Sequence, residues 1–429
     1  MKLAIIGGGW AGLAAAVAAV QAGHAVTVRE AARQFGGRAR SVSLPLPDGR
    51  ELLLDNGQHI LIGAYAQTLA LMRQVGVDPA QVLHRLPLTL RFPGGDGLAL
   101  PDWPAPLDAG WGIATTRGWS GRDKLSLLRH AAAWQLRGFT CDDALTVADL
   151  CATLRPAVLQ GLVEPLCVAA LNTPAQQASA RVFLRVLRDA LFGPSQGAWG
   201  ASNLLLPRVD LGRLLPVAAT QWLLAQGADV LAGSRVQAIA PAATGWTVDG
   251  EQFDAVVLAC PSAEAQRLVA QAAVPADDWL ARAGALTYKA IATVYTADGP
   301  RLPLPMLALR SDAQSPAQFV FDRAQLGGPE GVLAWVASAS EGDVAALEAG
   351  VLRQAAGLGW TVQPLRTVVE KRATFACTPG LRRPAIAIAP GLVAAGDYVE
   401  GPYPATLEGA VRAAQAAVAA LTAAGRTTR

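Results

Sequence analysis

The first thirty residues constrain the fold of this chain more than any other stretch. A short apolar run at residues 3–6 leads directly into a glycine fingerprint, with Gly7, Gly9 and Gly12 in the G-x-G-x-x-G positions. In such a turn the first glycine permits the tight bend, the second lets backbone approach a pyrophosphate, and the third lets helix and strand pack closely. The spacing therefore indicates a phosphate-binding turn.

The residues after the fingerprint supply the rest of the same unit. An alanine-rich segment at 10–22 predicts a helix that stops at Gly23, and residues 25–28 predict a second buried strand that leads to the acid Glu30. The N-terminus of that helix would offer N–H groups to phosphates, and the acid could accept hydrogen bonds from ribose hydroxyls. The predicted contacts beside the three glycines are Trp10, Ala11, Glu30 and Ala31. A parallel sheet that binds a dinucleotide is the expected result.

The composition of this segment argues against a secretory signal and against a membrane span. Lys2 precedes a long uncharged run, as in a secretory signal, but three consecutive glycines would interrupt its apolar part. A membrane span fails similarly, because alanine and glycine are poor membrane residues and the run is barely long enough.

The length, the net charge and the cysteine content narrow the class of protein. A chain of 429 residues predicts two domains, and a net charge of +3 argues against nucleic acid as a partner. Five cysteines without metal-type spacing predict free thiols, no metal site and a cytoplasmic location. The mean hydropathy of +0.30 leaves an apolar substrate or a membrane surface open.

Several motifs along the chain together resemble one superfamily. They are the fingerprint, the turn Gly36-Gly37-Arg38, the pair Gly396-Asp397 and the segment TLEGA at 406–410. These resemble the flavin amine oxidase and phytoene desaturase superfamily. The segment DNGQHILIGAY at 55–65 resembles one branch of it, the squalene-associated FAD-dependent desaturases, which act as hydroxysqualene dehydroxylases.

The resemblance implies a single, tightly held FAD, since only one nucleotide fingerprint is present. It also implies further cofactor contacts, including an adenine contact through the backbone at Val236 and a helix N-terminus near Ala405 that faces the flavin. These implied contacts are Gly37, Arg38, Gly57, Gln58, His59, Val236, Gly396, Asp397, Ala405 and Thr406. One departure is Ala413-Ala414, where family members often carry serine and glycine.

The expected fold class is α/β, with a discontinuous Rossmann-like FAD-binding domain and a mixed α+β substrate domain built on an antiparallel sheet. We assign residues 1–75, 204–265 and 385–429 to the first domain, and residues 76–203 and 266–384 to the second. The periodicity predicts these elements: a hairpin from 84–90 to 98–100, helices at 121–138, 146–171 and 174–192, strands at 234–239, 287–296, 317–322, 332–338 and 366–375, and a helix capped by Ser340.

The helix predicted at 121–138 has one face made of basic residues. Arg122, Arg129, His130 and Arg137 fall within a sector of roughly 100° at helical periodicity. Such a basic face fits an ordinary solvated surface, and it also fits a peripheral contact with the inner face of the cell membrane.

For the dehydroxylase branch, the resemblance implies loss of an allylic hydroxyl as water and delivery of a hydride by the flavin. A proton donor near the hydroxyl and otherwise apolar walls are then required. His59, Asp55 and Tyr403 are the candidate catalytic residues, with Tyr65 and Tyr398 as weaker ones; His59 could instead orient the flavin, and Asp55 could serve loop backbone.

Alternative activities and partners follow from the same comparison. A phytoene-type desaturase would run the hydride in the opposite direction, and an amine oxidase would use an aromatic cage and a lysine such as Lys289. The expected partners are an apolar isoprenoid substrate, an external electron donor of unknown identity, and synthases of the squalene type acting in the same pathway.

Overall fold

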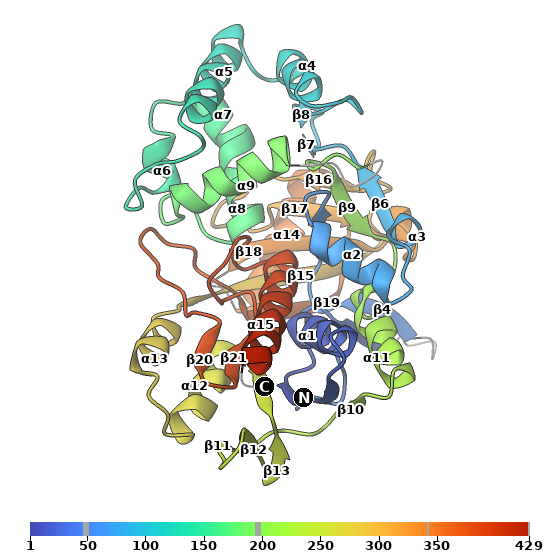
Figure 1. The fold of residues 1–429 in the computed structure, drawn as a ribbon. Coiled ribbons are helices and arrows are strands. Elements are labelled where there is room, and N and C mark those ends of the chain that lie inside the picture. Colours follow the sequence, from blue (N-terminus) through green and yellow to red (C-terminus); the bar gives the residue numbers. More distant parts are fainter. Residues whose placement is uncertain (46–50, 194–198, 341–342, 428–429) are drawn as a thin grey trace.

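The computed structural model describes residues 1–45, 51–193, 199–340 and 343–427 (Figure 1). Its first layer is a six-stranded sheet in the order β10-β2-β1-β14-β21-β20. β1 (Lys2–Ile6), α1 (Trp10–Gln21) and β2 (Ala25–Arg29) form the predicted N-terminal unit. Residues 3–6 of β1 are buried, as a central parallel strand covered on both faces requires.

The neighbours of β1 in this sheet come from distant parts of the chain. β14 (Ala255–Leu258) pairs parallel with β1 and with β21 (Leu392–Ala394), and β10 (Asp229–Leu231) pairs parallel with β2. β20 (Ala387–Ala389) closes the edge in the antiparallel direction. This confirms the discontinuous Rossmann-like fold, while the residue limits of the two domains stay a prediction.

The second sheet is antiparallel and has the order β16-β17-β18-β15-β19. Its strands are Met306–Ala308, Phe319–Asp322, Leu333–Ser340, Tyr288–Ala297 and Gln363–Phe375, named in that order. Four of them were expected, and together they confirm the predicted mixed domain. The prediction that Ser340 caps the following helix, α14 (Val344–Gly357), was wrong. Asp343 caps this helix by accepting a hydrogen bond from the N–H of Ala346, and Ser340 is the last residue of β18.

A block of helices covers one end of the molecule, at the top of Figure 1. It contains α4 (Leu107–Thr115), α5 (Gly121–Leu136), α6 (Val147–Leu150), α7 (Pro156–Val158), the π-helical turn Leu159–Val163, α8 (Glu164–Leu171) and α9 (Ala180–Phe192). The single helix predicted at 146–171 was wrong. The chain leaves the helix after Leu150 and re-enters it at Pro156, which stands at a helix start because it has no N–H to donate. The helix predicted from 174 begins only after Ser179, which caps it.

Two strand predictions also needed correction. The strand predicted at 84–90 is interrupted by Pro87: β6 (Leu83–Leu86) pairs with β9 (Leu204–Pro207), and only β7 (Thr89–Arg91) forms the hairpin with β8 (Gly97–Ala99). The stretch 234–238 carries no strand, because pairing starts at β11 (Ile239–Pro241).

The remaining elements connect these layers. They are β3 (Ser41–Pro45), β4 (Glu51–Asp55), β5 (Leu61–Ile62), α2 (Ala66–Gln74), α3 (Pro79–Val82), α10 (Leu211–Leu214), α11 (Pro216–Ala225), β12 (Trp246–Val248), β13 (Glu251–Phe253), α12 (Ser262–Gln271), α13 (Asp277–Gly284), the 3₁₀ turn Arg323–Leu326 and α15 (Leu407–Thr427). Within the described ranges, no helix is long and apolar enough to cross a bilayer, and no cluster of three or more His, Cys, Asp or Glu side chains could hold a metal ion.

The buried carboxylate of Glu408 joins the last helix to the first half of the chain. It is fully buried, and it accepts hydrogen bonds from the N–H groups of Gln67 and Thr68, from the Thr68 hydroxyl and from Arg412. Glu408 therefore caps the first turn of α2, whose own N-cap, Tyr65, provides no side-chain acceptor. Ala413 and Ala414, the departure from the family pattern, lie in the apolar core beside it.

Replacing Glu408 by alanine should therefore destabilise the fold. Glu408→Ala leaves two N–H groups and Arg412 without their acceptor, so we expect the free energy of unfolding to fall by about 3 kcal/mol. Glu251→Ala, which removes an exposed partner of Lys2, should cost less than about 0.5 kcal/mol. Denaturant titration of both variants checks this, and equal losses would contradict the role given to Glu408.

Candidate active site

The fingerprint loop has the close contacts that only glycine allows at two positions. A Cβ on Gly12 would lie 1.8 Å from the carbonyl oxygen of Gly7, and Gly7 itself has a φ of +112°. Gly9 precedes the first turn of α1 and has no side chain to cap it, so the N-terminus of the helix keeps its N–H groups for a ligand. Trp10 and Ala11 form that first turn and are buried.

Glu30 lies immediately after β2, where the sheet ends. One of its oxygens accepts from the N–H of Gly8 at 2.6 Å, and the other accepts from the N–H of Ala32 at 2.7 Å. Ala31 between them is exposed. The carboxylate is thus fixed beside the fingerprint, at the edge where a ribose would follow a bound pyrophosphate.

The turn at 36–38 packs directly on the fingerprint. Gly36 donates to the carbonyl of Gly8, and Gly37, with a φ of +60°, comes so close to Gly9 that a Cβ would lie 3.1 Å from the Gly9 Cα. Arg38 then reaches across the molecule, donating to the carbonyl of Ala373 at 2.6 Å and to Asp397 at 2.5 Å. One guanidinium therefore joins the nucleotide loop, strand β19 and the C-terminal segment.

The segment 55–59 is held by the antiparallel sheet. The Asp55 backbone exchanges two hydrogen bonds with the hydroxyl of Tyr295 on β15, and the N–H of Gln58 donates to the hydroxyl of Thr293. Arg323, only 5% exposed, donates to the side-chain oxygen of Gln58 at 2.9 Å. Tyr295, Thr293 and Arg323 were missed by the sequence analysis, which could at most have noted an arginine directly after the apolar strand β17.

The Asp55 side chain is fully buried between Leu211 and Arg323. One oxygen accepts from the N–H of Leu211 at 2.8 Å, and the other lies 3.6 Å from the Arg323 guanidinium. Burial raises the pKa of this carboxyl to about 6, although Arg323 and the Leu211 N–H both favour the charged form. At neutral pH Asp55 is therefore an ionised anchor between α10 and Arg323.

His59 is half-buried and has a defined tautomer. Its Nδ1 lies 2.7 Å from the carbonyl oxygen of Gly57, which can only accept, so Nδ1 carries the proton. Burial lowers the pKa of the imidazole, and the charge of Arg38 lowers it further, while the Gly57 carbonyl opposes the shift. At neutral pH His59 is uncharged and its Nε2 has a lone pair but no proton.

The C-terminal segment brings strained backbone to the N-terminus of α15. Gly396 and Asp397 follow β21, and Asp397 is 7% exposed. Its carboxylate accepts a hydrogen bond from Arg38, and its backbone carbonyl accepts one from the N–H of Ala405. Tyr403 and Ala405 both have left-handed φ values, +58° and +57°. Such values cost about 1 kcal/mol or more each for residues other than glycine, and they concentrate at functional sites. Thr406 then caps α15 by accepting from Gly409.

Two tyrosines form an edge-to-face pair near this turn. The rings of Tyr65 and Tyr403 have centroids 6.0 Å apart, and the Arg412 guanidinium lies 5.0 Å from the centre of the Tyr403 ring. Burial raises the pKa of Tyr403 to about 12, so its phenol keeps its proton at neutral pH. Tyr398 is not part of this pair: it is 3% exposed, and its hydroxyl has no hydrogen-bond partner among the described residues.

Val236 is buried and is hydrogen-bonded to α12. Its carbonyl oxygen accepts from Arg267, which is in turn held by Glu264. This link to α12 was not foreseen, because nothing local in the sequence connects residues 236 and 267.

These segments fit an FAD molecule. The uncapped start of α1 and the fixed carboxylate of Glu30 suit the pyrophosphate and ribose, and the buried, unpaired hydroxyl of Tyr398 adds an unsatisfied polar atom beside Asp397. The full set of cofactor contacts stays a prediction: Gly7, Gly9, Trp10, Ala11, Gly12, Glu30, Ala31, Gly37, Arg38, Gly57, Gln58, His59, Val236, Gly396, Asp397, Ala405 and Thr406.

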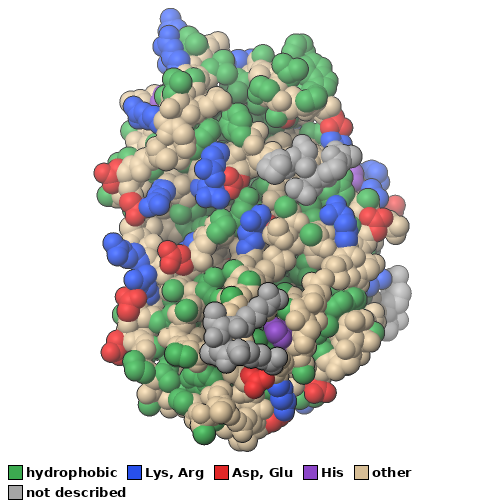
Figure 2. Space-filling view, in the orientation of Figure 1, with side chains coloured by type: hydrophobic (Ala, Val, Ile, Leu, Met, Phe, Trp, Pro, Cys, Tyr) green, Lys and Arg blue, Asp and Glu red, His purple; other side chains and the backbone are tan. Residues whose placement is uncertain are grey.

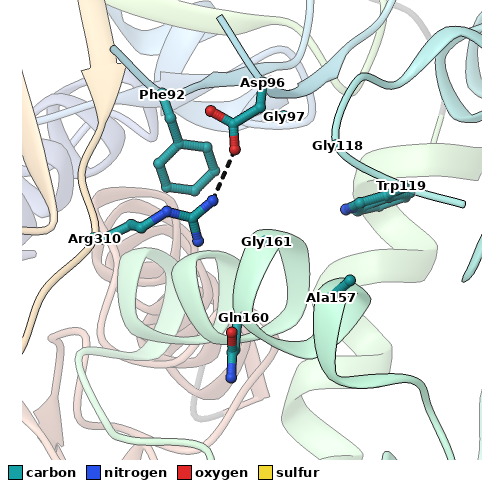
Figure 3. A pocket seen from close by; sticks show the side chains of 9 residues that line it. All are labelled: Phe92, Asp96, Gly97, Gly118, Trp119, Ala157, Gln160, Gly161 and Arg310. Atoms are coloured by element: carbon teal, nitrogen blue, oxygen red, sulfur yellow. Dashed lines mark hydrogen bonds and ion pairs between the residues drawn. The ribbon is translucent and has the colours of Figure 1, made fainter. Parts of the chain in front are cut away.

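A separate cavity of about 140 Å³ lies in the helical end of the molecule (Figure 3). Phe92, Asp96 and Gly97 face the π-helical turn across it, with Trp119 on another side. Arg310 donates to Asp96 at 2.7 Å and stacks 4.8 Å from the centre of the Phe92 ring. None of the predicted site residues lines this cavity, so it is distinct from the cofactor site.

Comparisons with known proteins identify the family and the fold. The chain matches the sequence profile of the flavin containing amine oxidoreductases over residues 10–422. It is 30% identical to the hydroxysqualene dehydroxylase of Rhodopseudomonas palustris and 27% identical to that of Sinorhizobium fredii, over 98% and 95% of both chains. An oxidoreductase from Methanosarcina mazei has the same fold, with a TM-score of 0.72 at 17% identity, covering 97% of this chain and 99% of its own.

The contact between Gly12 and Gly7 gives a direct test of the cofactor site. Gly12→Ala places a methyl group against the Gly7 carbonyl, so we expect protein without flavin absorbance and a loss of stability on the order of 3 kcal/mol. Gly110→Ala, in an open position on α4, should keep its flavin and gain up to about 1 kcal/mol. Absorbance spectra and thermal melts of both purified variants decide it; a yellow, stable Gly12→Ala protein would contradict the assignment.

Proposed function

The chain belongs to the flavin-containing amine oxidoreductase family and is an FAD-dependent oxidoreductase, and from this premise we propose that it reduces hydroxysqualene to squalene. The observation that carries this proposal is similarity to hydroxysqualene dehydroxylases along 98% of both chains, because it includes the helical block as well as the nucleotide fold. The low proportion of charged residues, 16%, suits an isoprenoid substrate.

In this reaction the carbon–oxygen bond of an allylic alcohol breaks and a carbon–hydrogen bond replaces it. Bound FAD in its reduced form supplies the hydride. The chain has to supply a proton for the departing hydroxyl, exclude bulk water and hold the alcohol in place. An external reductant must return the electron pair after each turnover.

Among the three candidate proton donors, the geometry favours Tyr403. Asp55 is fully buried and faces Leu211 and Arg323, so it is placed to anchor the segment 55–59. Neutral His59 has its only N–H committed to Gly57, which suits orientation of the cofactor more than proton donation. Tyr403 is half-buried and lies on the strained turn next to Ala405. Burial and the carboxylate of Asp189, to which its hydroxyl is hydrogen-bonded, raise its pKa, so the phenol keeps its proton and would have to turn from Asp189 to the substrate to donate it.

Two other activities of the same family are the alternatives. A phytoene-type desaturase would remove a hydride from a polyene precursor. An amine oxidase would need an aromatic cage, for which the Tyr65–Tyr403 pair is a candidate, and Lys289 on β15. The source of the alcohol in the proposed pathway would be a prenyl-joining synthase of the squalene type.

Incubation with substrate tests the proposed reaction. Protein with its flavin photoreduced under argon should convert hydroxysqualene to squalene while the flavin reoxidises, as followed by absorbance and by extraction of the product. Reduced flavin that persists without product would contradict the proposal. Oxidised protein incubated with phytoene, or with putrescine, should give neither desaturated product nor peroxide.

Paired variants test the assignment of the proton donor. Tyr403→Phe should retain FAD and lose at least about 100-fold in turnover, since general acid catalysis contributes that much. His59→Gln should keep turnover within about tenfold. Because the phenol stays protonated up to a pKa of about 12, wild-type turnover should not fall between about pH 6 and 9 through loss of this proton. Full activity in Tyr403→Phe would remove Tyr403 from the mechanism.

A further inference from the structure

Exposed apolar side chains are concentrated at the helical end of the molecule. Twelve large hydrophobic residues are exposed among the described residues, and half of them fall between 103 and 136. They are Trp103, Leu107, Trp111, Leu125, Leu128 and Leu136. Trp103 and Trp111 contact each other, with ring centroids 5.4 Å apart. Figure 2 shows hydrophobic side chains gathered at the top of the molecule, where Figure 1 places α4 and α5.

The apolar residues of α5 form a stripe on its outer side. Leu125, Leu128 and Leu136 follow at i, i+3 and i+11, with Ala132 between them, and so lie within roughly 80° around the helix. Leu127 and Trp134, which are buried, point the other way into the domain. The helix thus has two apolar faces, and only one of them is used by the fold. Leu136 is 89% exposed.

Most of the charges around this stripe are positive. Residues 103–140 contain five cations, whereas their two acids, Asp108 and Asp123, are buried. Asp123 is already satisfied by Ser120 and Arg155. Exposed acids flank this window at Asp102, which pairs with Arg85, and at Asp142 and Asp143 after α5. Between them the exposed charge is basic, as expected for a surface that approaches anionic lipid.

A hollow beside the leucine stripe is suited to an anion. It has a volume of about 330 Å³ and is lined by Arg122, Arg129, Arg155 and His130, together with Leu125. The guanidinium groups of Arg122 and Arg129 make no hydrogen bond or ion pair with other described residues, so they are available for phosphate oxygens. His130 is fixed by Ser126 and Thr153.

We propose that α4 and α5 form a docking face for an anionic lipid bilayer. The leucine stripe and the Trp103–Trp111 pair enter the interface, and Arg122 and Arg129 bind lipid phosphates in the adjoining hollow. An aromatic pair, an apolar stripe and flanking arginines on one surface are the features by which interfacial helices bind membranes. The alternative, a solvated basic face, explains the arginines but leaves the exposed leucines and tryptophans without a role.

Vesicle sedimentation of the full chain with bound FAD tests this proposal without any substrate, so its outcome is separate from that of the proposed reaction. The protein should sediment with vesicles of phosphatidylglycerol and phosphatidylcholine in equal parts, and much less with phosphatidylcholine alone. Arg122→Gln with Arg129→Gln should weaken partitioning on the order of 30-fold, about fivefold for each cation. Leu125→Ser with Leu128→Ser and Leu136→Ser should weaken it at least tenfold.

Matched variants on other elements serve as controls. Arg73→Gln with Arg301→Gln and Leu224→Ser with Leu231→Ser change exposed residues outside α4 and α5, and both should sediment like wild type. Flavin content and melting temperature confirm that each variant is folded. Equal binding to both vesicle types, wild-type binding by the site variants, or equal loss in the controls would overturn the proposal. Binding that inorganic phosphate abolishes at constant ionic strength, and that the leucine variants retain, would overturn it as well.

Discussion

The two halves of this molecule depend on the guanidinium of Arg38. It comes from the loop beside the glycine fingerprint, binds the backbone of β19 through Ala373, and pairs with Asp397 at the end of the nucleotide sheet. Both acceptors lie more than three hundred residues after Arg38 in the chain. One guanidinium thus joins them to the nucleotide loop; it is more weakly hydrated than an ammonium and can hold several acceptors in fixed directions. Arg38 thus links the antiparallel sheet, through β19, to the six-stranded nucleotide sheet beside the predicted flavin site.

The local parts of this arrangement could be predicted from the sequence. The fingerprint, α1, β2 and Glu30 follow one another within thirty residues, and each is fixed by neighbours close in the chain. The antiparallel sheet was also predicted, because its strands have β-type patterns. The breaks at Pro87 and Pro156 differ from the predicted elements, and both lie at prolines, which have no N–H to continue a strand ladder or a helix.

Most partners of the site residues could not be predicted, because they are supplied by tertiary packing. Asp55, His59 and Tyr403 were selected by motif position, yet their properties follow from Leu211, Arg323, Gly57 and Arg412. The burial of Asp55 depends on tertiary contacts that no periodicity reveals, whereas the tautomer of His59 depends on the carbonyl of Gly57, two residues away in the chain. Reading a motif gives the residue types of such a site, whereas its protonation states require the fold.

The order of strands in the nucleotide sheet has a consequence for biosynthesis. β1 is among the first residues to be made, but one of its two neighbours, β14, follows some 250 residues later, and β21 and α15 come last. Contacts of such long sequence separation form slowly, and unpaired strand edges are exposed in the meantime. The pocket for the dinucleotide therefore cannot be complete until nearly the whole chain has left the ribosome, which makes cofactor capture a late event in the folding of this protein.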